Sequence, residues 1–336
     1  MTPLFRRIRI AIVVLALLLA GSFALVSHLW KDRPDLAELN WPLAAPTSGQ
    51  ADGVTVTWFG VTTLLLDDGE TQIMIDGNFT RLSLAQILTL RPVLSDVAAI
   101  NHAVADYRID RLAAIVPVHS HFDHAMDVGH LANRSSALVI GSESTANIAR
   151  GAGVPVAQYQ NLASGESRQF GDFVITLIES RHAPIGFGED AWFPGQIDEP
   201  LEQPARVSAW QEGVSYSIVI EHPSGTVLVQ GSAGFIRNNL KDVRADVVIL
   251  GVAGLASLGE EYTAEFWRET VMMTGASRVY PVHFDDFTQA LGTIVPFPRI
   301  ADDVVETAAW LNELASDEQH PVVIERLPFG AAITLY

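Results

Sequence analysis

Three histidines and an aspartate fall within six consecutive residues, His119-Ser120-His121-Phe122-Asp123-His124. This cluster follows an apolar run at residues 113–118, which has the length of a buried strand. In an extended segment residues two apart point the same way, so His119 and His121 can bind one metal ion together. Asp123 and His124 lie just beyond and can turn toward a second ion. Neutral imidazole and carboxylate suit Zn²⁺, so the pattern predicts a site for one or two zinc ions.

Other polar residues stand where further strands are predicted to end. They are Asp76, His182, Ser232 and His283. The strands expected before them cover residues 71–76, 173–178, 226–230 and 278–282. The first of these pairs with residues 54–66 in a hairpin around an Asp-Gly turn. Sites in open α/β sheets form beyond the carboxyl ends of strands, so we expect these side chains to meet the cluster at 119–124.

The order of these residues along the chain resembles that of the metallo-β-lactamase-fold hydrolases. That family has an early Asp after a hairpin, a His-x-His-x-Asp-His motif, a lone His, a carboxylate after a second hairpin, and a final His. The resemblance covers residue 54 to the C-terminus. It implies an α/β fold, a four-layer αβ/βα sandwich with the metal ions at one edge of the two sheets.

The resemblance also implies a role for each ligand. His119, His121 and His182 are expected to hold the first metal ion, and Asp123, His124 and His283 the second. Asp123 is also expected to orient the attacking hydroxide.

Several charged residues near the ligands have two interpretations each. We expect Asp76 to support the site by accepting a hydrogen bond from a ligand histidine. Asp127 is either a second such support or a carboxylate favoured by a helix N-terminus. Arg81 can meet an anionic substrate or form a salt bridge, and Asp285 and Asp286 can orient His283 or lie in solvent.

Ser232 departs from the family pattern, which has a metal-bridging aspartate at this position. A hydroxyl is a poor ligand at neutral pH. Two Zn²⁺ with one carboxylate and one hydroxide carry a formal charge of about +2, against +1 with the bridging aspartate. The serine therefore predicts a weaker second metal site and a stronger attraction for anionic substrates.

The expected activity is hydrolysis by a metal-bound hydroxide, because a bound metal lowers the pKa of water to roughly 7. The substrate is expected to be a small ester, lactone, amide or phosphodiester, including amphiphilic ones. Residues 58–63 (Trp-Phe-Gly-Val-Thr-Thr) resemble the branch that holds the ascorbate-phosphate lactonases and the N-acyl phosphatidylethanolamine phospholipase D. The alternatives are a β-lactam hydrolase and a non-catalytic metal-binding protein of the cell envelope.

The N-terminus has the pattern of a membrane-targeting segment. Three arginines at positions 6, 7 and 9 precede an apolar stretch at residues 10–26. Residues 1–30 are predicted to be a signal anchor or a cleaved signal peptide. The positive flank favours a cytoplasmic N-terminus, with the rest anchored on the extracytoplasmic side or exported. Residues 31–53 read as a linker and residues 54–336 as the hydrolase domain.

Composition narrows the possible partners. The 336 residues carry a formal net charge of −18, which disfavours nucleic acid. There is no cysteine, so disulfides and thiolate ligands are excluded.

A long loop at residues 184–213 carries four aromatic side chains that either line an apolar pocket or cover the core. They are Phe187, Trp192, Phe193 and Trp210.

Overall fold

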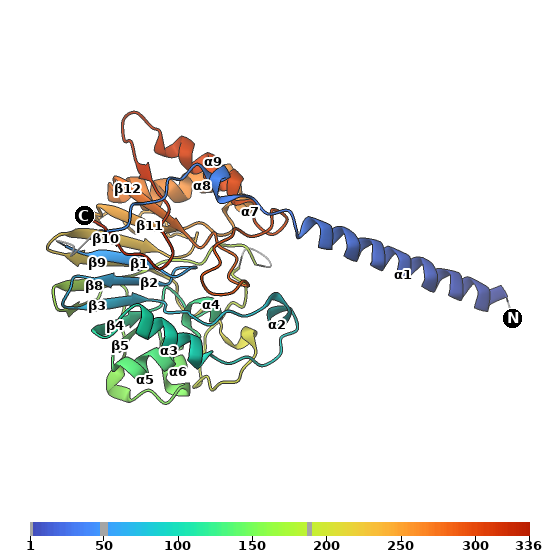
Figure 1. Ribbon diagram of the computed structural model, residues 1–336, viewed down its shortest axis with the longest axis horizontal. Coiled ribbons are helices and arrows are strands. Elements are labelled where there is room, and N and C mark those ends of the chain that lie inside the picture. The colour runs from blue at the N-terminus through green and yellow to red at the C-terminus, as the bar shows by residue number, and fades with distance from the viewer. Residues whose placement is uncertain (1–2, 48–52, 187–189) are drawn as a thin grey trace.

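The computed structural model describes residues 3–47, 53–186 and 190–336. Two seven-stranded sheets pack face to face, and helices cover their outer surfaces (Figure 1). The order in the first sheet is β14 (Ile333–Thr334), β1 (Thr55–Trp58), β2 (Leu64–Asp67), β3 (Gln72–Ile75), β4 (Leu112–Val116), β5 (Leu138–Gly141) and β6 (Tyr159–Asn161). The order in the second is β13 (Val323–Ile324), β12 (Arg278–Val282), β11 (Val247–Gly251), β10 (Gly225–Gln230), β9 (Tyr216–His222), β8 (Phe173–Glu179) and β7 (Ser167–Phe170).

The helices complete the four layers that the sequence predicts. The first sheet is covered by α3 (Val97–Asp106), α5 (Val128–Ser135) and α6 (Glu143–Gly151), and the second by α7 (Leu255–Leu258), α8 (Glu260–Trp267) and α9 (Val304–Ala315) (Figure 1). The short helices α2 (Leu84–Leu88) and α4 (Phe122–Ala125) lie at the edge where strands β3 and β4 end. The prediction of an αβ/βα sandwich is confirmed.

Strand direction explains why the polar residues meet. Strand β3 runs parallel to β4, and β10, β11 and β12 run parallel to one another. Their carboxyl ends therefore share one edge, where the chain continues into the predicted ligands. All five residues of β11 are buried, as expected for an apolar strand covered on both faces.

One predicted element differs in detail from the structure, and two helices are irregular. The run at 54–66 forms two strands, β1 and β2, because Gly60 (φ +92°) and Val61 (φ +51°) turn the chain between them. Helix α4 ends before α5 begins, and Asp123 and His124 lie on α4. Helix α8 continues into a π-helical turn, Arg268–Met272.

Residues 31–53 were expected to form a linker, but much of this segment packs on the domain. Leu39 and Trp41 are buried in the core, and the Trp41 ring contacts Phe284 with 6.0 Å between ring centroids. The Ala44 N–H donates to the Arg326 carbonyl at 2.9 Å. Apolar side chains at these positions make docking more favourable than exposure to water. Residues 48–52 lie outside the described part of the chain.

The N-terminal helix α1 (Pro3–Leu29) projects away from the domain (Figure 1). It contains an apolar window, Ile12–Leu29, with a mean hydropathy of 2.4, and none of the side chains that the structure describes in this window is buried. By length and composition this helix can cross a membrane.

Candidate metal centre

The motif at 119–124 joins the end of β4 to the start of α4. His121 is the N-cap of α4, with extended backbone angles, and Asp123 and His124 form the first turn of that helix. His119 and His121 therefore stand two residues apart on extended chain, and the helix turns the next two ligands in another direction. This local geometry separates the ligands into two groups, as the motif predicts.

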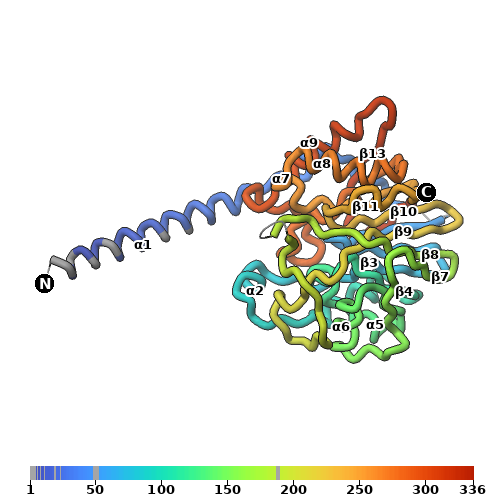
Figure 2. The backbone as a smooth tube through the Cα atoms, turned by 180° about the vertical axis from the view of Figure 1, so that it is seen from behind, coloured from blue at the N-terminus to red at the C-terminus, as the bar shows by residue number. Residues whose placement is uncertain are grey.

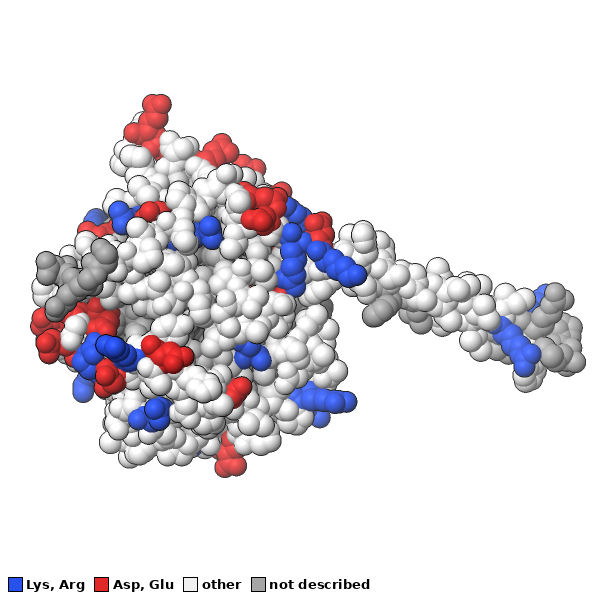
Figure 3. Space-filling model, in the orientation of Figure 1, with Lys and Arg blue, Asp and Glu red and all other residues white. Residues whose placement is uncertain are grey.

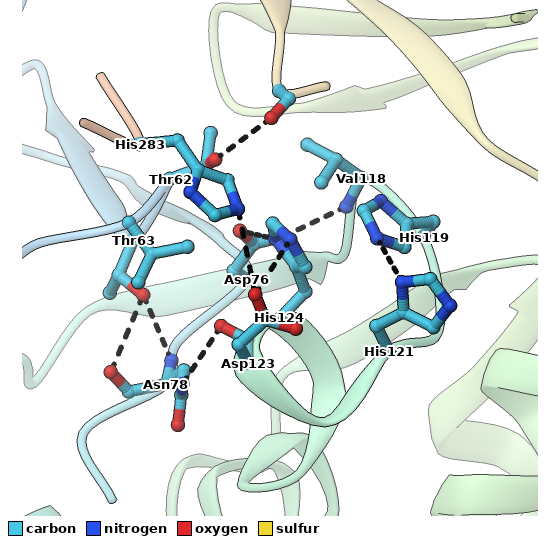
Figure 4. Close-up of polar contacts among 12 residues, drawn as sticks. Thr62, Thr63, Asp76, Asn78, Val118, His119, His121, Asp123, His124 and His283 are labelled. Atoms are coloured by element: carbon cyan, nitrogen blue, oxygen red, sulfur yellow. Dashed lines mark hydrogen bonds and ion pairs between the residues drawn. The ribbon is translucent and has the colours of Figure 1, made fainter. Parts of the chain in front are cut away.

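The first group consists of His119, His121 and His182, whose ring nitrogens lie within 4.8 Å of one another. The Nε2 atom of His119 is 2.9 Å from the Nδ1 atom of His121 (Figure 4). Burial lowers the pKa of His119 well below its usual range, that of His121 to about 4 and that of His182 to about 3. The three rings are thus neutral at pH 7, and their converging lone pairs fit a divalent cation.

The second group consists of Asp123, His124 and His283, all buried, with ligand atoms again within 4.8 Å. Asp123 Oδ2 lies 3.6 Å from His124 Nε2 and 3.5 Å from His283 Nε2. Burial favours protonation of Asp123, but the charges and hydrogen bonds of His124 and His283 outweigh it and hold the pKa well below its usual range. An ionised carboxylate between two imidazoles suits a second cation.

Asp76 fixes the orientation of His124. Its Oδ2 atom accepts a hydrogen bond from His124 Nδ1 at 2.7 Å, and its Oδ1 atom accepts from the Val118 N–H at 2.8 Å (Figure 4). Burial lowers the pKa of His124, but the charges of Asp76 and Asp123 outweigh it and raise that pKa. With Nδ1 protonated, Nε2 is left to face the second group. This is the supporting role that the sequence predicts for Asp76.

His283 is held by a turn that the sequence did not single out. Its backbone N–H donates to the Val61 carbonyl at 3.1 Å, and the Val61 N–H donates to the Asp285 carboxylate at 2.9 Å. Both His283 (φ +60°) and Val61 (φ +51°) adopt left-handed backbone angles, which strain a β-branched residue. Asp285 therefore positions His283 through Val61.

Ser232 supports the segment that carries His182. Its Oγ atom accepts a hydrogen bond from the Ala183 N–H at 2.9 Å. Gly234 allows the loop after β10 to lie directly against the segment that carries His182. A Cβ atom at this position would lie 2.2 Å from the Arg181 carbonyl oxygen and 2.4 Å from that of His182.

Asp127 fixes the loop that follows Asp76. Its carboxylate accepts from the N–H groups of Phe79 and Thr80, at 2.9 and 2.7 Å, and from the Thr80 hydroxyl at 2.8 Å. In that loop Asn78 donates to the Asp123 carbonyl at 2.8 Å (Figure 4). Asp127 thus acts on the site through the loop, and sequence reasoning missed Asn78 because no spacing links it to the ligands.

The remaining charged candidates make structural ion pairs and hydrogen bonds. Arg81 donates to the carbonyls of Phe59 and Asn78, both at 2.7 Å, and is not among the described residues that line the pocket over the ligands. Asp286 pairs with Arg33 at 2.6 Å, which attaches the N-terminal segment to the loop after His283. The interpretations in which these residues meet a substrate or orient the imidazole of His283 are not supported.

A pocket of about 590 Å³ opens over both groups of ligands. Its floor includes His121, Asp123, His182, Ser232 and His283. Its walls are mainly apolar and are formed by Leu84, Ile87, Leu88, Leu90, Phe122, Ile185, Trp192, Phe193, Phe287 and Phe297. Of the loop aromatics, Trp192 and Phe193 line the pocket, Trp210 is fully buried in the core, and Phe187 lies outside the described residues.

The fold and this arrangement of ligands define a class of protein. A family model described as the metallo-beta-lactamase superfamily matches residues 56–308. The chain belongs to that superfamily. The match to the branch suggested by residues 58–63 stays a prediction.

Two similar proteins are both described as UPF0173 metal-dependent hydrolases. A UPF0173 metal-dependent hydrolase of Pyrobaculum islandicum is 23% identical over 243 residues, which are 69% of this chain and 84% of the relative. A protein of that description from Myxococcus xanthus is 25% identical over 254 residues, 74% of this chain and 76% of the relative.

A similar solved structure is that of CmlA, a diiron beta-hydroxylase from Streptomyces venezuelae. The two superpose with a TM-score of 0.51 at 12% identity, over 86% of this chain and 55% of CmlA. At this identity the similarity supports the fold alone.

Proposed function

We propose that this chain is a metal-dependent hydrolase whose substrate is a small ester, lactone, amide or phosphodiester, including amphiphilic ones. The observation that carries the proposal is the pair of ligand groups side by side on the floor of one pocket. Family membership and the relatives described as metal-dependent hydrolases support the same activity.

The nitrogen and oxygen ligands favour one or two Zn²⁺ ions. His119, His121 and His182 would hold the first ion, and Asp123, His124 and His283 the second. When bound, such ions lower the pKa of water and polarise a carbonyl or phosphoryl oxygen.

The protein's own groups organise that chemistry. Asp123 Oδ2 lies within 3.6 Å of the ring nitrogens of His124 and His283 and can accept a hydrogen bond from water, which would orient the water toward the substrate. Asp76 keeps the proton of His124 on Nδ1. The apolar walls exclude bulk water and so strengthen electrostatic interactions at the floor.

The shape of the pocket favours an amphiphilic substrate. Its apolar walls would bind a hydrocarbon or aromatic part, and its polar floor would bind the group to be hydrolysed. We further propose that α1 anchors the protein in a membrane with the domain on the extracytoplasmic side, or that it directs export if it is cleaved. The apolar window Ile12–Leu29 and the exposed Arg7 and Arg9 before it support this topology.

The test is a substrate screen with purified full-length protein whose metal content has been measured. Panels of phosphodiesters, lactones, esters and amides should include one class that is hydrolysed and that loses hydrolysis with a chelator or with His121→Ala. A chromogenic β-lactam in the same screen tests the alternative of β-lactam hydrolysis. Tight metal binding with no turnover in any panel would instead favour a non-catalytic metal-binding protein.

A further inference from the structure

Exposed apolar side chains lie at the mouth of the pocket and in an adjoining depression, which Leu94 and Val97 line together with Gln86 of α2. They are Leu88 (71% exposed), Leu90 (40%), Leu94 (61%), Val97 (46%), Trp192 (48%) and Ile300 (48%), and together they form the apolar rim. Leu88, Leu90 and Trp192 also line the pocket, and Ile300 precedes its lining residue Ala301. Contiguous apolar surface of this kind marks an interaction site on a soluble domain.

The end of α1 is fixed next to this apolar rim. The apolar window of the helix ends at Leu29, and the chain continues in helical turns to Asp32, whose N–H donates to the Leu29 carbonyl. The Asp32 carbonyl then accepts from the Arg299 N–H at 2.9 Å, one residue before Ile300. Arg33 binds the Pro296 carbonyl at 2.7 Å. The domain thus follows the apolar helix without a free linker.

Both views of the backbone place the rim and the helix on one side of the domain. Helix α2, which carries Leu88, lies on the side from which α1 leaves in Figure 1 and again in Figure 2. In Figure 3 this side, below the helix, is mostly white and blue, whereas red atoms gather on the opposite side and along the top. The exposed basic residues Lys31 and Arg91 adjoin the end of the apolar window and Leu90 in the chain.

We propose that the apolar rim docks on the lipid bilayer that α1 enters. The inference rests on the membrane anchor proposed above. Because α1 is tied to the segment before Ile300, a bilayer around its apolar window lies directly against the rim. Lys31 and Arg91 would then meet the headgroups and the leucines the acyl region, which is the usual arrangement at an interface. The pocket opens at this surface, where amphiphiles dissolved in the membrane can reach the ligands.

Site-specific fluorescence tests the docking without reference to catalysis. The chain has no cysteine, so each introduced cysteine is labelled alone. Full-length protein would be reconstituted in nanodiscs of phosphatidylcholine and phosphatidylglycerol. An environment-sensitive dye would be attached at Leu94→Cys or Ile300→Cys. The matched control is Val156→Cys, an apolar residue that is 78% exposed and lies outside the rim. Leu18→Cys, on the exposed face of α1, reports insertion of the anchor.

Lipids with a nitroxide near the headgroup should remove most of the dye fluorescence at positions 94 and 300 and leave position 156 bright. Leu94→Asp should reduce the quenching at position 300, because a charge opposes entry into the acyl region. A blue-shifted emission at position 18, which reports burial in the acyl region, with no quenching at 94 and 300 would overturn the docking while leaving the anchor intact, as for a rim covered by a protein partner. An emission at position 18 typical of a dye in water would overturn both. Neither result bears on the proposed hydrolysis.

Discussion

At the scale of single residues, the sequence predicts the six candidate ligands and Asp76 as a support, but not the supports that act through backbone contacts. Residue type and position at the ends of predicted strands indicate the six candidate ligands. The structure brings all six into two groups. Asn78 and Val61 act on Asp123 and His283 through backbone groups, from positions set only by tertiary packing. Ser232 lines the floor of the pocket and its hydroxyl accepts a hydrogen bond from the Ala183 N–H, so its expected role at the metal ions stays a prediction.

Asp76→Asn should weaken the second metal site selectively. The amide would place an N–H₂ group or a weaker acceptor against His124 Nδ1, so that Nε2 is no longer kept free of a proton. Loss of such a support typically costs about 10–100-fold in metal affinity. Calorimetric titration with Zn²⁺ should show that the weaker of the two binding events becomes weaker still, while the affinity of the tighter event is unchanged. Asp242→Asn, at an exposed acid, should change nothing.

The first group also predicts how the metal-free protein responds to pH. In the folded state the pKa of His121 is about 4 and that of His182 about 3, below the value of about 6.5 in the unfolded chain. The unfolded state therefore binds more protons below pH 6.5, and stability falls as the pH drops from 6.5 toward 4. Thermal unfolding with a chelator present should show this fall, and His121→Asn with His182→Gln should flatten it. An equally steep fall in that double variant would contradict the assignment.

At the scale of elements, strand order was predictable and the close contacts between loops were not. Apolar runs followed by polar residues predict β4 and β12. The turn at Gly60 and Val61 falls within a run predicted as one strand, because residues 54–66 contain only apolar residues, threonine and one glycine, and backbone angles separate β1 from β2. The contact between the loop after β10 and the segment carrying His182 likewise depends on the packing of two distant loops.

Gly234→Ala tests that contact. The new Cβ atom would overlap the backbone carbonyls of Arg181 and His182, which no side-chain rotation can relieve. The segment must move, so we expect loss of affinity at the first metal site, measured by calorimetric titration with Zn²⁺, and a lower midpoint of unfolding. Gly69→Ala is the control, since it lies in an open hairpin turn at φ +93°. It should cost roughly 1 kcal/mol of stability and leave metal affinity unchanged.

At the scale of the whole molecule, the order of motifs along the chain predicts the four layers, and the apolar stretch predicts the N-terminal helix. The sequence does not predict how that helix joins the domain. Residues 31–53 are rich in proline and polar side chains, and that pattern is typical of a linker. The structure instead buries Leu39 and Trp41 in the core. These side chains and the buried Ala44 are interrupted in the chain by Asn40 and Pro42, so only the folded domain shows where they bind.

Truncation separates the helix from the packed segment. Removing residues 1–30 should leave the unfolding midpoint of the domain unchanged, because the side chains described in the apolar window of α1 contact solvent and not the core. Removing residues 1–45 should destabilise it, since Trp41 fills space against Phe284 and its Nε1–H donates to Asn312 at 3.1 Å. Loss of a buried aromatic of this size typically costs about 3–5 kcal/mol. Urea denaturation of both truncations in one buffer measures the difference, and Trp41→Ala in the shorter truncation isolates the aromatic. Equal midpoints for all three proteins would show that the segment contributes nothing to the fold and would restore the interpretation of residues 31–53 as a free linker.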